Sequence, residues 1–169
     1  MSNEEGASHE EQLLSACMMD QSDLVKELLR SPRTLDINHT NGLGYSALHY
    51  AARTGSIDCV KLLAGERGIN PNLQDRLDMD TPLHKALIHC EESEDALELT
   101  KLLLKAGSDP RILNKKLQRP VNLVEPEEED IRRLLLQATL AFDSQRIKQV
   151  DADKGKTEVE SDGGSCSSD

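Results

Sequence analysis

Apolar positions along the chain recur in pairs of short helical segments. In each pair, apolar residues fall three and four positions apart, a break follows, and a second segment of the same kind completes the pair. This spacing is typical of helices that bury one face. The first apolar positions of successive pairs lie at offsets of 35, 35 and 38 residues, at Leu13, Leu48, Leu83 and Val121. The pattern therefore predicts an all-α chain built from about four repeated helical pairs.

The clearest helix start lies at residues 81–84, and residues 46–49 match the same pattern less closely. Thr81 can accept a hydrogen bond from an amide of the first helical turn, as capping residues do. Pro82 follows at the first helical position, where its missing N–H costs nothing. The helices are expected to end at glycines, Gly55 in the second pair and Gly107 in the third, because glycine readily takes a positive φ.

These motifs resemble the ankyrin repeat. Thr-Pro-Leu-His is followed by alanine, a glycine break, paired leucines and a Gly-x-Asn-x-Asn exit, at a period near that of this family. The resemblance covers residues 11–138 and implies a solenoid of helix-turn-helix repeats with hairpin-like finger loops between them. It also implies that His49 and His84 have structural roles, joining neighbouring turns by hydrogen bonds. A narrower resemblance, to a group of small fungal ankyrin-repeat proteins, rests on three segments: Asp109-Pro110-Arg111 with Asn114, Pro120-Val121-Asn122-Leu123-Val124, and Leu134-Leu135-Leu136-Gln137-Ala138.

The resemblance divides the chain into a repeat domain with two tails. We expect the domain over residues 11–140, with repeats at about 11–40, 41–74, 75–113 and 114–140. The first and last repeats depart from the pattern, as terminal caps do. Residues 1–10 are expected to be a disordered acidic tail, and residues 141–169 the end of the last helix followed by a second disordered acidic tail.

The net charge of −11 lies mostly in these tails. Residues 1–12 and 151–169 each contribute −4, whereas the rest of the chain contributes only −3. This acidity argues against nucleic acid as a partner. The longest apolar runs are three or four residues, so no membrane-spanning helix is expected. The four cysteines show no paired spacing and the N-terminus is polar, so we expect a reduced protein in the cytoplasm or also in the nucleus.

The sequence contains no recognisable catalytic or metal-binding constellation. His84, His89 and Cys90 lie close together, but their spacing is not one that holds zinc, and a fourth ligand is missing. The Gly-x-Gly at residues 42–44 lacks the strand-turn-helix context of a phosphate loop. The acidic run at residues 127–130 is interpreted as a favourable helix start. We therefore expect no enzyme activity, no metal and no cofactor.

The hypothesis favoured by the sequence is a monomeric adaptor that binds a protein segment in its groove. Tyr45 is the best single candidate, because an exposed aromatic residue concentrates binding energy. In the second finger, Asp78 and Asp80 are expected to flank the apolar residues. The candidate partner-binding residues lie on the fingers and the first helices: Leu43, Tyr45, Arg53, Arg76, Leu77, Met79, His89, Lys115 and Leu117. The alternative is an escort that shields a basic client protein with the acidic tails.

Overall fold

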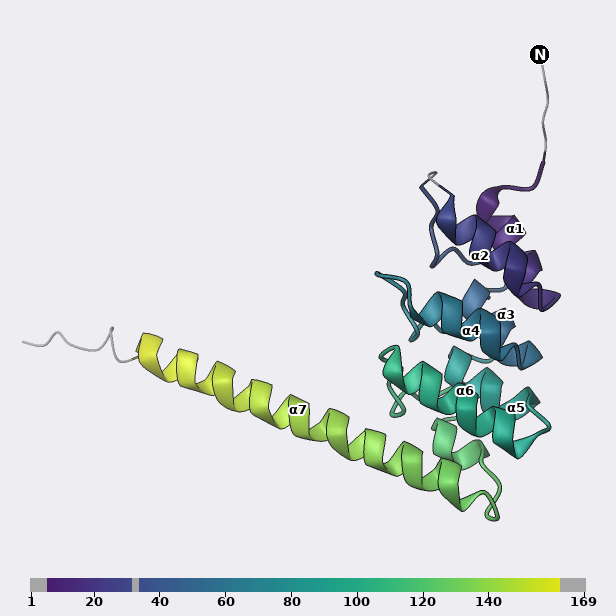
Figure 1. Cartoon of the computed structure of the whole chain (residues 1–169). Helices are drawn as coiled ribbons and strands as arrows, with labels where there is room; N and C mark the ends of the chain where they lie inside the picture. Colours follow the sequence, from purple (N-terminus) through teal and green to yellow (C-terminus); the bar gives the residue numbers. More distant parts are fainter. Residues whose placement is uncertain (1–5, 32–33, 162–169) are drawn as a thin grey trace, which may run out of the picture.

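The computed structural model describes residues 6–31 and 34–161. These parts of the chain form seven α-helices, one 3-10 helix and no named strand, as the all-α prediction required (Figure 1). The elements in chain order are α1 His9–Met18, α2 Ser22–Arg30, α3 Ala47–Thr54, α4 Ile57–Ala64, α5 Pro82–His89, α6 Ser93–Lys105, η1 Pro120–Leu123 and α7 Glu129–Ser161.

The helices stack in two layers. The inner layer runs from α1 through α3 and α5 to η1, each in contact with the next, and the outer layer runs in the same way from α2 through α4 and α6 to α7 (Figure 1). A single apolar cluster extends between the layers from Leu13 in α1 to Leu135 in α7. It is built almost wholly from leucine, valine, isoleucine and alanine, so each repeat depends on its neighbours to bury its apolar faces.

Two inner helices begin with the same reciprocal cap. In α5, the Thr81 hydroxyl oxygen accepts from the backbone N–H of His84, and Nδ1 of His84 accepts from the backbone N–H of Thr81. Ser46 and His49 repeat this arrangement at the start of α3. Each cap satisfies two amides that the helix itself leaves without a partner.

Glycines in the left-handed region follow two of the helices. Gly55 caps the C-terminal end of α3 with a φ of 73°. Gly107, with a φ of 104°, comes directly after Ala106, which caps α6. A residue with a Cβ would be strained at either position, so the chain turns where the sequence supplies glycine.

The last repeat and the tails differ from expectation. The inner element of the fourth repeat is the single 3-10 turn η1 rather than an α-helix. Helix α7 continues to Ser161 and projects beyond the stack, so the helix end expected at the start of residues 141–169 lies further along the chain than expected (Figure 1). From Glu129 to Ser161 the sequence contains no proline and a single glycine, so nothing in it stops the helix. Helix α1 starts at His9, and the predictions for residues 1–5 and 162–169 lie outside the described residues.

Candidate protein-binding surface

Three extended loops form fingers that lead into the inner elements. They span residues 41–46, 75–81 and 114–119, and are called the first, second and third finger below. The first two fingers lead into α3 and α5, and the third leads into η1. Each finger is closed by a backbone hydrogen bond, with donor–acceptor distances of 3.1 Å from Asn41 to Tyr45, 3.0 Å from Asp75 to Asp80 and 3.0 Å from Asn114 to Gln118. The fingers are therefore hairpin-like turns with defined tips.

Neighbouring fingers are joined directly through their backbones. The amide of Arg76 donates to the carbonyl of Leu43 at 2.9 Å, and the amide of Lys115 donates to the carbonyl of Asp78 at 2.7 Å. The three tips therefore stand side by side in one continuous row. Residues separated by more than thirty positions in the sequence become neighbours on this edge of the molecule.

The tips carry apolar side chains that remain exposed. The exposed fractions are 48% for Leu43, 48% for Leu77, 42% for Met79 and 76% for Leu117. Two basic side chains, Arg76 and Lys115, are also exposed on the same fingers. These six residues, all candidates from the sequence, are brought together by the structure and are called the finger row: Leu43, Arg76, Leu77, Met79, Lys115 and Leu117.

Tyr45 does not belong to this surface, and its interpretation as an exposed contact residue is wrong. Its side chain is only 6% exposed. The ring stacks on Tyr50 with centroids 5.2 Å apart and meets the ring of His49 edge-on at 5.7 Å. The ammonium group of Lys85 lies 5.3 Å from its centroid. Tyr45 therefore supports the fingers from beneath rather than contacting a partner.

Lys85 is buried beneath the second finger, where the sequence interpretation did not place a functional residue. Its ammonium nitrogen lies 2.9 Å from a carboxylate oxygen of Asp75 and 2.9 Å from one of Asp80, and all three side chains are almost completely buried. Asp80, expected on the surface, is thus an internal residue. Its other carboxylate oxygen accepts from the amide nitrogen of Asn114 at 3.1 Å. This Lys85 cluster links both ends of the second finger to the base of the third.

The electrostatics of the cluster favour its charged form. Burial alone would raise the pKa of Asp75, but hydrogen bonds from backbone amides and the proximity of Lys85 lower it below its ordinary value. Burial would likewise lower the pKa of Lys85, yet hydrogen bonds to Asp80 and Asp75 outweigh burial and raise it. The sequence did carry a signal for this cluster, because a lysine occupies the position after Leu-His where the previous repeat has Tyr50.

His49 and His84 join each repeat to the next finger. Because Nδ1 accepts from a backbone amide in both residues, the proton resides on Nε2. Nε2 of His49 donates to the carbonyl of Asp80 at 3.1 Å, and Nε2 of His84 donates to the carbonyl of Gln118 at 3.0 Å. Burial lowers the pKa of both imidazoles below the ordinary value of 6.5. The ring nitrogens of His84 are thus engaged within the protein.

Arg53 and His89 lie apart from the finger row. Arg53 is in the last turn of α3 and His89 in the last turn of α5, whereas the fingers lead into the first turns of these helices. Both residues are exposed, and burial together with the charge of Arg53 lowers the pKa of His89. The structure therefore places these two candidates at the opposite end of the inner helices.

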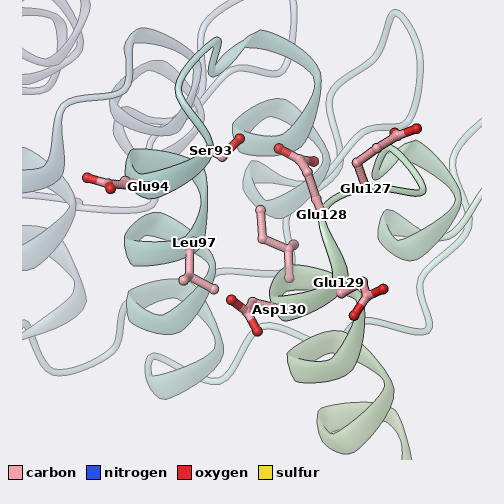
Figure 2. Close-up of a pocket in the computed structure, with 8 residues that line it drawn as sticks. Ser93, Glu94, Leu97, Glu127, Glu128, Glu129 and Asp130 are labelled. Atoms are coloured by element: carbon pink, nitrogen blue, oxygen red, sulfur yellow. The ribbon is translucent and has the colours of Figure 1, made fainter.

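An acidic pocket of about 470 Å³ lies between α6 and the start of α7 (Figure 2). Its apolar lining residues are Leu97 and Ile131. Its acidic lining combines Glu94 with the run at residues 127–130, two segments that are more than thirty positions apart in the sequence. The acids of the first turn of α7, Glu129 and Asp130, also lie where they interact favourably with the positive end of the helix.

Known proteins share this repeat arrangement. The family model for ankyrin repeats (3 copies) matches residues 13–114. An ankyrin repeat-containing protein of Saccharomyces cerevisiae is 36% identical over 152 residues, which cover 84% of this chain and 84% of that protein. Human BCL-6 corepressor-like protein 1 is 38% identical over 46% of this chain but only 4% of its own length. The E3 ubiquitin-protein ligase HACE1 of Danio rerio is 44% identical over 37% of this chain and 7% of its own length.

Within the described residues, none of the helices combines the length and the apolar character needed to cross a membrane.

Proposed function

The chain belongs to the ankyrin-repeat family, and from this premise we propose that it is a non-enzymatic adaptor that binds a protein segment along the finger row. Ankyrin repeats in general mediate protein–protein interaction. The observation that supports this finer proposal is the exposure of four apolar side chains on tips that backbone hydrogen bonds hold in line. A soluble domain gains no stability from exposing such side chains in one place, whereas a binding surface uses them.

The charges on and next to the finger row indicate the kind of partner that fits it. Lys115 and the neighbouring Lys116 are exposed at the third finger, and Arg76 is exposed at the second, where Asp78 is the opposing charge. A segment with apolar side chains at its centre and acidic residues near the third finger would complement this surface. Such complementary charges increase the rate and specificity of association.

The test is a selection of 12-residue phage-displayed peptides on the full chain, followed by affinity measurement with a dye-labelled peptide. The double variant Leu43→Asp with Leu77→Asp should weaken binding by about 2 kcal/mol or more, roughly thirtyfold, if the row contains hot spots. A matched control introduces the same change on exposed leucines of α7, Leu136→Asp with Leu140→Asp, and should leave the affinity unchanged. A selection without enriched peptides, or equal affinities for both variants, would overturn the proposal.

The second candidate is an escort for a basic client protein. It is supported by the net charge of −11 and by the acidic pocket on the folded body (Figure 2). Salt distinguishes the two functions, because exposed charge pairs are screened over about 10 Å at 0.1 M ionic strength. A basic peptide held by acidic residues should dissociate when salt is raised from 50 to 300 mM, whereas a peptide held by the finger row should remain bound.

A further inference from the structure

Each of the three fingers turns through one residue with a positive φ. In the first finger this residue is Gly44, with a φ of 81°. In the second and third fingers it is Met79, with a φ of 57°, and Leu117, with a φ of 59°. The same backbone conformation is therefore filled once by glycine and twice by a long apolar residue.

Glycine is required in the first finger for a steric reason that does not apply to Met79 or Leu117. A Cβ at Gly44 would lie 2.9 Å from the backbone nitrogen of Arg76, so no side chain fits there. Met79 and Leu117 have room for a side chain, but the left-handed region is unfavourable for them. Asp20, another described non-glycine residue with a positive φ, is of a type that tolerates this conformation.

Burial of the two side chains does not compensate the energetic cost of the left-handed backbone. The side chain of Leu117 is 76% exposed and that of Met79 is 42% exposed. Neither residue is part of the apolar core. The folded chain would therefore lose little by having glycine or asparagine at either position, so stability does not account for these residues.

Hydrogen bonds around the two residues fix their backbones. The carbonyl of Met79 accepts from the side-chain amide of Gln74 at 2.8 Å. A carboxylate oxygen of Asp75 accepts from the amides of Leu77 and Asp78, while Lys85 holds the other carboxylate oxygen. In the third finger, the side-chain oxygen of Asn114 accepts from the amides on either side of Leu117, at 3.0 and 2.9 Å. Strain persists where its surroundings determine the conformation in this way.

We propose that Met79 and Leu117 are the residues of the finger row that contribute most to the affinity for the partner, held in a strained backbone so that their apolar side chains project from the fingers. This inference rests on the proposed binding function of the finger row. The partner is a protein segment that places apolar side chains against Met79 and Leu117 and acidic side chains near Lys115 and Lys116. Because the fingers are already ordered, binding loses little conformational entropy at these two positions.

The experiment uses the full chain and the dye-labelled phage-selected peptide. Met79→Gly with Leu117→Gly removes both side chains and relieves the backbone, so Tm should stay constant or rise by about 1–4 °C, while the Kd should increase at least tenfold. Met79→Asn with Leu117→Asn removes the apolar side chains but keeps a residue that tolerates positive φ, so it should weaken binding to the same extent. Leu113→Ala serves as the control, because Leu113 is also apolar and exposed but lies outside the finger row.

The outcomes separate this inference from the function on which it rests. A decrease in Tm of more than about 4 °C in the glycine variant would show that the two residues stabilise the fold, and would overturn the inference. Unchanged affinity in the glycine and asparagine variants, together with lost affinity in Leu43→Asp with Leu77→Asp, would overturn the inference alone. Unchanged affinity in all of these variants would overturn the proposed function as well.

Discussion

Lys85 is the residue whose surroundings most constrain the finger row. It is buried with two carboxylates at 2.9 Å, so its removal leaves uncompensated negative charge inside the protein. Lys85→Met should lower the free energy of unfolding by about 3–5 kcal/mol, measured by urea denaturation. The control is Lys61→Met, because Lys61 and Glu98 form a pair 3.6 Å apart whose side chains are about half exposed. That change should cost no more than about 1 kcal/mol. Equal effects of the two substitutions would contradict the structural role of the Lys85 cluster.

The buried histidines give the protein a predictable response to acid. Burial lowers the pKa of His49 and His84 in the folded state below 6.5, so the unfolded state binds protons more readily. Their stabilising contribution is therefore complete above pH 6.5 and is lost as the pH falls below it, by at most about 1.4 kcal/mol per pH unit for each histidine. His84→Ala should cost about 1–3 kcal/mol at pH 7.5 and should reduce this pH dependence. A urea midpoint that stays constant from pH 8 to pH 5.5 would disprove the assignment.

At the scale of elements, local sequence signals located the helices well but not their full extent. Thr81 with Pro82, and Ser46 before α3, are found at the predicted helix starts because capping depends on residues within one turn. The extension of α7 was missed because its polar, charged sequence was interpreted as disorder. Arg111, which lies 2.9 Å from Asp143 and 5.3 Å from the ring of Phe142, connects this helix to the repeats, and that contact spans more than thirty residues.

In the fingers, too, features set by neighbouring residues in the sequence were predictable, whereas features set by contacts with distant residues were not. The fingers were implied by the resemblance to the ankyrin repeat, and the six candidates of the finger row are exposed on them, as expected. The burial of Tyr45 was not predictable in this way, because it depends on how the ring packs against Tyr50 and His49 and on Lys85 from the next repeat. The left-handed backbones of Met79 and Leu117 were equally hidden, since neither residue type favours that conformation.

For the whole molecule, the linear stack makes the effect of a core substitution depend on its position. Leu83 in α5 and Leu13 in α1 are both almost completely buried, so Leu83→Ala and Leu13→Ala should each cost about 2–5 kcal/mol. Among the described elements, helix α5 contacts both α3 and η1, whereas α1 has an inner-layer neighbour on one side only. Stability in a stack is a sum of repeat and interface contributions. The central substitution should therefore lower the free energy of unfolding of all the repeats together.

The terminal change should instead release the first repeat from an otherwise intact stack. Amide hydrogen exchange followed by mass spectrometry would then show faster exchange in α1 and α2 of Leu13→Ala, with α4 and α6 protected as in the wild type. In Leu83→Ala, exchange should increase across all repeats. If Leu13→Ala also increased exchange uniformly through α6, the chain would unfold as one cooperative unit. The finger row would then depend on the terminal repeat as strongly as on the Lys85 cluster beneath it.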